Sequence, residues 1–105
     1  MTDTAIEITT KIKINTDLKP PAKYSLIYIN DDKTSMDFVI FSLMEVFGYG
    51  LDAAMHLTKT VHEQGSGIVK SGLSKEIAAH LRNLVISKAR AENFPLDVKI
   101  EEDNS

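Results

Sequence analysis

Three adjacent polar residues, Asn30, Asp31 and Asp32, carry the most distinctive chemistry in this sequence. An alternating apolar segment ends directly before them and a helix start follows, so all three lie on one strand-to-helix turn, here called the Asn-Asp-Asp turn. Each side chain presents oxygen acceptors, and two of them are carboxylates. Such a cluster favours a cation, either a metal ion or an ammonium group. Isolated Asn and Asp residues are also common at turns and helix starts, so that interpretation stays open.

The sequence around the turn does not favour a metal. A calcium loop needs further oxygen ligands at alternating positions, and Lys33 stands where the next one is wanted. His56 and His80 are too far apart for a paired zinc motif, and the chain has no cysteine. It contains neither a Gly-rich phosphate loop nor a nucleophile elbow. We therefore expect no metal, no cofactor and no catalytic activity.

A second set of residues lies on the two helices that follow. Thr58, Val61 and His62 are three and four positions apart, so they share one helix face. Met36 and Val39 share a face near the start of the preceding helix. If the two faces meet, they form an apolar pocket beside the turn, with His62 at its rim. Such a pocket suits a ligand with an ammonium group next to an apolar side chain, although these residues fit ordinary core positions equally well.

Periodicity and capping signals predict the elements that position these residues. We expect strands over 23–29, 67–73 and 96–101, and helices over 36–47, 51–64 and 75–91. Thr34 with Asp37 predicts a capping box for the first helix, Gly65 a C-cap for the second and Ser74 an N-cap for the third. The order predicts an α/β (α+β) fold, a small β-α-α-β-α-β sandwich of a three-stranded sheet and three helices.

Two apolar stripes should bind the helices to the sheet. The residues expected to face inward on the first helix are Met36, Val39, Ile40, Leu43 and Phe47. Those expected to face inward on the third helix are Ile77, Leu81, Leu84, Val85 and Ala89.

Composition and charge narrow the class of protein. The chain has 105 residues, 43% of them hydrophobic, and a net charge of −3, which suits one soluble cytoplasmic domain. With no basic stripe and no long apolar segment, we expect neither nucleic acid nor membrane as a partner. Residues 1–22 are rich in Thr, lack aromatics and end near Pro20 and Pro21, which predicts a flexible tail before a folded domain over 23–105.

Four motifs, taken together, resemble the ClpS family. They are N-D-D at 30–32, T-x-M-x-F-V at 34–39, V-H-x-Q-G at 61–65 and A-R-A-E-N-x-P-L at 89–96. They occur in the family's order and near its spacing, and the resemblance covers about residues 20–101. ClpS proteins are bacterial adaptors that recognise N-degrons and pass them to a Clp ATPase–protease. The resemblance therefore implies a monomeric adaptor whose partners are N-degron polypeptides and the N-terminal domain of a Clp AAA+ ATPase.

The resemblance also implies a role for each site residue. Asn30, Asp31, Asp32 and His62 would hold the substrate's α-amino group. The residues that would line a pocket for a large first side chain (Leu, Phe, Tyr or Trp) are Thr34 at the mouth, Met36, Val39, Val61 and Leu96. Thr58 stands where the family often has Met, and we expect it to reach the ligand because it shares a face with Val61. The tail would engage the ATPase during hand-over, and a family Lys thought to touch the ATPase aligns near Leu81.

Two other classes of function remain as alternatives. The first is a metal-dependent hydrolase that uses the Asn-Asp-Asp turn, although one turn supplies all the acids and no second ligand cluster exists. The second is a non-catalytic interaction module like the C-terminal domain of a ribosomal stalk protein, which has the same layout. That module would have no use for acids beside a pocket, so the adaptor hypothesis leads.

Overall fold

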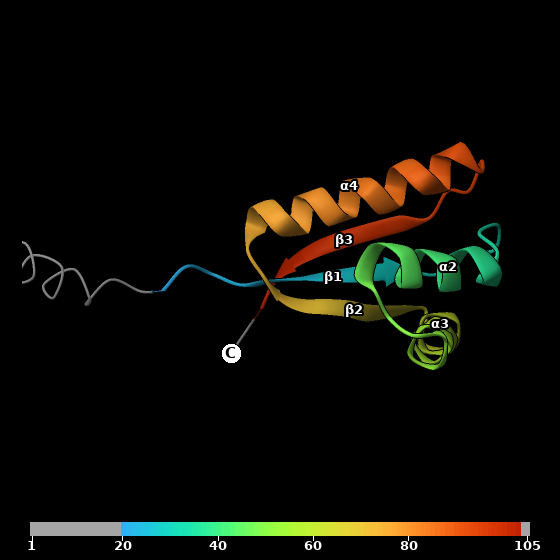
Figure 1. The fold of residues 1–105 in the computed structure, drawn as a ribbon, viewed down its shortest axis with the longest axis horizontal. Helices are drawn as coiled ribbons and strands as arrows, with labels where there is room; N and C mark the ends of the chain where they lie inside the picture. The colour runs from blue at the N-terminus through green and yellow to red at the C-terminus, as the bar shows by residue number, and fades with distance from the viewer. Residues whose placement is uncertain (1–19, 104–105) are drawn as a thin grey trace, which may run out of the picture.

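The computed structural model describes residues 20–103, so most of the predicted tail lies outside the described residues. The elements within this range are β1 (Tyr24–Ile29), α2 (Met36–Phe47), α3 (Leu51–Gln64), β2 (Ser66–Leu73), α4 (Lys75–Ala91) and β3 (Asp97–Glu102). This arrangement confirms the predicted α+β class and the bounds of each predicted helix (Figure 1). Each strand differs from its predicted bounds by one residue: β1 starts one residue later, β2 starts one residue earlier, and β3 starts and ends one residue later.

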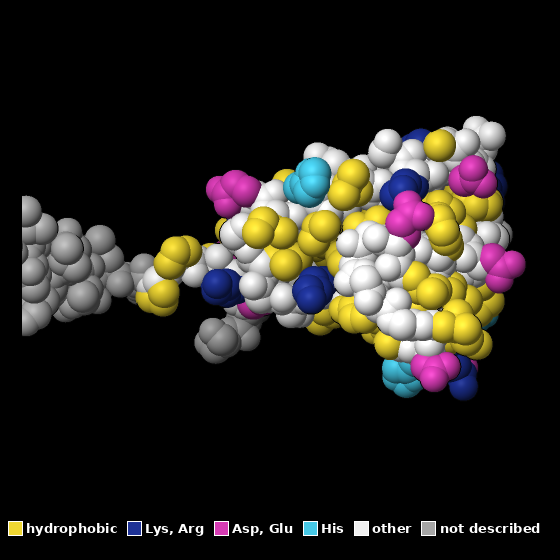
Figure 2. Space-filling view, viewed as in Figure 1, with side chains coloured by type: hydrophobic (Ala, Val, Ile, Leu, Met, Phe, Trp, Pro, Cys, Tyr) yellow, Lys and Arg dark blue, Asp and Glu magenta, His cyan; other side chains and the backbone are white. Residues whose placement is uncertain are grey.

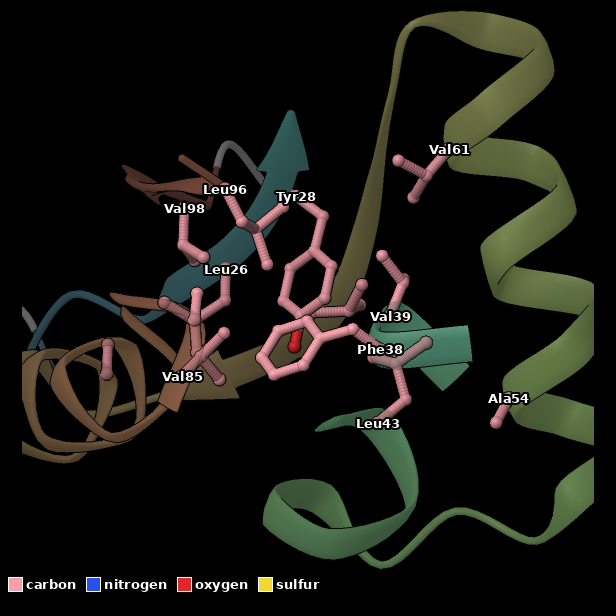
Figure 3. Packing of buried hydrophobic residues seen from close by; sticks show 13 residues of the cluster. Leu26, Tyr28, Phe38, Val39, Leu43, Ala54, Val61, Val85, Leu96 and Val98 are labelled. Atoms are coloured by element: carbon pink, nitrogen blue, oxygen red, sulfur yellow. The ribbon is translucent and has the colours of Figure 1, made fainter. Parts of the chain in front are cut away.

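The sheet places β1 at its centre, in the order β2-β1-β3, with both pairings antiparallel. Alternate residues of β1 point to opposite faces. Leu26 and Tyr28 point to the helices and are fully buried, whereas Ile27 lies on the other face, opposite the exposed Ile68 of β2. The three helices therefore cover one face of the sheet, and the apolar core lies between the two layers (Figure 3).

A buried hydrogen-bond chain fixes α2 on the sheet. The Ser42 hydroxyl donates to the carbonyl oxygen of Val39 (2.8 Å) and lies 2.8 Å from the Tyr28 hydroxyl. Because Ser42 has only one hydroxyl proton, Tyr28 is the donor in the second bond. Burial raises the pKa of Tyr28 strongly, which outweighs the hydrogen bond to Ser42 and keeps the phenol protonated. These two hydrogen bonds hold the first turns of α2, and with them Val39, in a fixed place.

The start of α2 differs from the predicted capping box. The N-cap is Ser35, not Thr34, and its hydroxyl oxygen accepts a hydrogen bond from the backbone N–H of Phe38 (3.1 Å). The Thr34 hydroxyl instead donates to a carboxylate oxygen of Asp31 (2.8 Å). The prediction was wrong because a charged acceptor three residues upstream competes for the Thr34 side chain. The predicted caps Gly65 and Ser74 are confirmed.

The inward face of α4 agrees only in part with the predicted stripe: Val85 and Ala89 are buried and Leu81 packs against the core, as predicted. Ile77 and Leu84 are 52% and 39% exposed, whereas Ala78, Val85 and Ala89 are buried. Two of the three buried side chains are alanines, which let a helix approach the sheet closely. The predicted stripe favoured large apolar residues. It therefore included Ile77 and missed Ala78, although small residues face the sheet here. Met36 of α2, another predicted core residue, is 47% exposed.

Candidate functional site

A cavity of about 300 Å³ lies between three segments of the chain. They are the Asn-Asp-Asp turn directly after β1, the start of α2, and the second half of α3. Its lining residues are Asn30, Asp31, Asp32, Thr34, Met36, Val39, Thr58, Val61 and His62. Every residue of the predicted site is in this set except Leu96, which is 1% exposed within the core. The structure thus brings together the turn and the two helix faces that the sequence left separate.

A backbone contact joins the turn to α3. The N–H of Asn30 donates to the carbonyl oxygen of Gly65 (2.9 Å), directly after the last strand residue. Gly65 ends α3 in the left-handed region at φ 87°, and its own N–H returns to the Val61 carbonyl. The last turn of α3, which carries His62, is therefore held beside the Asn-Asp-Asp turn. The sequence predicts Gly65 as a C-cap but does not reveal this second role, because no local signal marks a long-range contact.

The two aspartates of the turn have different environments. One carboxylate oxygen of Asp31 accepts hydrogen bonds from the backbone N–H groups of Lys33 (2.8 Å) and Thr34 (2.6 Å), and the other accepts from the Thr34 hydroxyl (2.8 Å). Partial burial alone would raise the pKa of Asp31, but these hydrogen bonds, with a contribution from the charge of Arg90, outweigh it and lower the pKa below its usual value. Asp31 is therefore an ionised group that shapes the turn.

The rim of the cavity carries acceptors that are not used within the fold. The side chains of Asn30, Asp32 and His62 are exposed, and they make no hydrogen bond to another residue between 20 and 103. The carboxylate of Asp31 also has capacity beyond its three bonds, since a carboxylate offers about four acceptor sites. Acceptors from several directions thus converge above the cavity.

The floor of the cavity is apolar. Thr58, Val61 and Val39 are 2%, 3% and 7% exposed. The Thr58 hydroxyl donates to the Ala54 carbonyl of its own helix (2.7 Å), so its hydrogen-bonding proton is already committed. Figure 3 shows Val61 projecting from α3 into the space between α3 and the sheet. An apolar floor below a polar rim can hold an apolar side chain with a cationic group at its base.

Other hollows are larger, and acidic side chains line some of them as well. The groove between α2 and α4 has a volume of about 580 Å³, and its floor includes Phe41, which is 52% exposed. Of its three acids, Glu45 forms an ion pair with Lys88, whereas the side chains of Asp37 and Glu92 accept no hydrogen bond from another described residue. Hydrophobic side chains also gather on the surface over α2 and α3 (Figure 2). The smaller cavity differs from this groove because its lining contains no Lys or Arg and combines the Asn-Asp-Asp turn with the buried side chains of Val39, Thr58 and Val61.

The His, Asp and Glu side chains of residues 20–103 do not form a candidate metal centre. Between residues 20 and 103, no three His, Asp or Glu side chains come together in a way that could hold a metal ion. In the same range, no helix is both long and apolar enough to cross a membrane.

Comparison with known proteins shows consistent similarity. The sequence profile of the family described as "ATP-dependent Clp protease adaptor protein ClpS" matches residues 19–99. The ATP-dependent Clp protease adapter protein ClpS of Campylobacter jejuni (strain 81-176) is 43% identical over 89 residues, covering 84% of this chain and 91% of that one. Its counterpart in Oleidesulfovibrio alaskensis is 36% identical over 91 residues, covering 87% and 86%. The structure of Agrobacterium tumefaciens ClpS2 bound to L-phenylalaninamide matches with a TM-score of 0.77 at 27% identity, covering 80% of this chain and 100% of that one.

The fold, the turn and the cavity together define a small α+β protein with a candidate ligand-binding cavity beside an acidic turn. Because the family profile spans most of the chain and relatives exceed 30% identity over most of their length, the chain belongs to the ClpS family of adaptors of the ATP-dependent Clp protease. The resemblance seen in the four sequence motifs is confirmed. The partner class is accordingly the ATPase of a Clp protease, and family membership favours the adaptor over the hydrolase and the ribosomal-stalk-like module.

Proposed function

We propose that this adaptor recognises the first residue of N-degron substrates and delivers them to a Clp AAA+ ATPase–protease. The α-amino group binds at the rim formed by Asn30, Asp31, Asp32 and His62, and a large hydrophobic side chain (Leu, Phe, Tyr or Trp) enters the cavity below. The observation that carries this proposal is the set of unused acceptors directly above an apolar floor. A related ClpS2 binds L-phenylalaninamide, which joins an α-amine to an aromatic side chain.

The chemistry of the rim distinguishes a chain terminus from an internal residue. An α-amine has a pKa of about 8, so at neutral pH it is an ammonium group. It offers three donors, which match acceptors that converge from several directions. An acetylated or internal residue has no such charge and leaves the acids of the rim desolvated without a partner. That penalty rejects it more strongly than a difference in side-chain size would.

The remaining parts of the proposal concern delivery. The adaptor acts as a monomer in the cytoplasm and docks on the N-terminal domain of the ATPase, and the segment before the folded domain, residues 1–22, engages the ATPase during hand-over. Leu96 belongs to the buried core of the domain and does not line the cavity. The adaptor itself performs no catalysis and needs no cofactor, because the ATPase–protease supplies the chemistry.

A binding experiment tests the recognition step. Fluorescence anisotropy of a labelled Leu-initiated peptide should show saturable binding to the full chain. The same peptide with an acetylated α-amine, and a Gly-initiated peptide with a free amine, serve as matched controls for the two parts of the site. We expect both controls to bind at least tenfold more weakly, the scale of one charge-assisted hydrogen bond or one buried side chain. Equal binding of the free and acetylated peptides would refute recognition of the amine.

A further inference from the structure

Gly67 of β2 lies so close to Val61 of α3 that a side chain at position 67 would press on the valine. A Cβ atom placed on Gly67 would lie 3.0 Å from Cγ2 of Val61, 3.6 Å from Cγ2 of Thr60 and 3.7 Å from the Val61 backbone nitrogen. The first distance is tighter than nine in ten real Cβ contacts, so the Val61 methyl group would have to shift by a few tenths of an ångström. At Gly48, Gly50, Gly65 and Gly72 the same construction meets nothing within 4 Å. The close approach is therefore particular to Gly67.

The backbone does not require glycine at this position. Gly67 is not among the glycines with positive φ, and it pairs in register with Tyr28 of β1. A strand interior normally favours a residue with a side chain over glycine. What the glycine provides at position 67 is space for the neighbouring helix.

Val61 connects this space to the candidate site. Val61 is 3% exposed, it packs against Gly67, and it forms part of the apolar floor of the cavity. Protein cores are closely packed, so a displaced methyl group moves toward the nearest empty volume. The cavity that Val61 lines is that volume. A methyl group at position 67 would therefore push Val61 into the space that receives the ligand.

We infer that Gly67 is a specificity-determining positioning residue, which sets the width of the cavity by allowing Val61 to sit back against β2. It acts through Val61 and does not itself bind the substrate. The inference rests on the proposed function, because it concerns the size of first side chain that the cavity admits. Glycine at position 67 makes the cavity wide enough for the bulkiest side chains, and alanine narrows it in favour of Leu.

The test is a double-mutant cycle with the full chain. Affinities of Leu-, Phe- and Trp-initiated peptides are measured for the parent, Gly67→Ala, Val61→Ala and the combined variant. We expect Gly67→Ala to weaken binding of the Phe and Trp peptides roughly tenfold, the effect of about one methylene in an apolar pocket, and that of the Leu peptide much less. In the Val61→Ala background the same glycine substitution should have no such effect, since the obstructing methyl group is gone.

Gly50→Ala is the matched control. Gly50 is the N-cap of α3, the helix that carries Val61, and has φ −71°. A Cβ atom at position 50 meets nothing within 4 Å, so this variant should keep the parent's order of peptide affinities. An unchanged Phe/Leu ratio in Gly67→Ala, or an equal change in both Val61 backgrounds, would overturn the inference.

A second measurement separates this inference from the proposed function. In Gly67→Ala, NMR should show the Val61 methyl groups closer to Val39 and Met36, whether or not any peptide binds. If the parent binds no peptide, the proposed function fails, and the Val61 methyl contacts still decide the positioning role. Unchanged methyl contacts in Gly67→Ala would refute that role by themselves.

Discussion

Removing the carboxylate of Asp31 should destabilise the fold, whereas removing that of its neighbour Asp32 should mainly weaken ligand binding. Asp31 accepts three hydrogen bonds within the turn, two from backbone N–H groups and one from Thr34. A hydrogen bond to a charged group contributes about 1.5–3 kcal/mol net, but water can replace the lost acceptor at this partly exposed turn. The helix-cap scale of about 0.5–2 kcal/mol is therefore the better guide. We expect Asp31→Ala to lower the free energy of unfolding by about 1–2 kcal/mol.

The stabilising effect of Asp31 should depend on pH in one direction. The pKa of this carboxyl group is lowered in the folded protein, so the unfolded chain binds the proton more tightly. The stabilisation is fully present above the ordinary Asp pKa of about 3.9, and it is lost as the pH falls through the lower pKa of the folded state. The stability difference between the parent and Asp31→Asn should therefore shrink on acidification below about pH 4.

Urea unfolding followed by circular dichroism measures both effects. Asp32→Ala is the control, because Asp32 makes no hydrogen bond to another described residue, and its unfolding free energy should stay within about 0.5 kcal/mol of the parent's. Its affinity for a Leu-initiated peptide should fall by about 1.5–3 kcal/mol, which is tenfold or more. If Asp32→Ala were as destabilised as Asp31→Ala, or if Asp31→Ala were as stable as the parent, the assignment of roles would be wrong.

Three further predictions concern selectivity, delivery and chemistry. Thr58 is buried in the cavity floor and is shorter than Met. Thr58→Met should therefore raise the affinity for a Leu-initiated peptide relative to an Ile-initiated peptide, by about 1 kcal/mol in binding free energy. An unchanged Leu/Ile affinity ratio would place Thr58 outside the ligand's reach. Deleting residues 1–18 should keep peptide affinity within a small factor and abolish degradation by the cognate ATPase–protease; lost peptide affinity would make this segment part of the site. Peptide incubated with the purified adaptor alone should stay intact, and metal-stimulated cleavage that disappears in Asp32→Ala would contradict the adaptor hypothesis.

The features that the sequence predicted well depend on local signals. The ends of α2, α3 and α4 follow from short-range periodicity and from caps such as Gly65 and Ser74, and all were predicted at the correct residues. The two helix faces of the cavity were also predictable, since residues three or four positions apart must share a face. Their convergence was not predictable from spacing alone, because it depends on the contact between Asn30 and Gly65.

The features that the sequence predicted poorly depend on competition between partners or on side-chain size. Thr34 matches a capping box, but Asp31 takes its hydroxyl and leaves the N-cap to Ser35. On α4, Ala78 rather than Ile77 faces the sheet, since close packing selects the smaller residue. Gly67 reads as an ordinary strand residue in the sequence, and only its distance to Val61 reveals a role. Such effects require the positions of neighbours that are distant in the sequence.

The most direct test of amine recognition is an NMR titration of the isotope-labelled full chain with L-phenylalaninamide and with its N-acetyl form. We predict that the free amine shifts the resonances of Asn30, Asp32, Val61 and His62, while residues of the groove between α2 and α4, such as Phe41, stay unchanged. The acetylated compound should produce little change at equal concentration. Equal shifts with both compounds, or shifts confined to the groove, would contradict the proposal that this cavity recognises a chain's first residue through its α-amine.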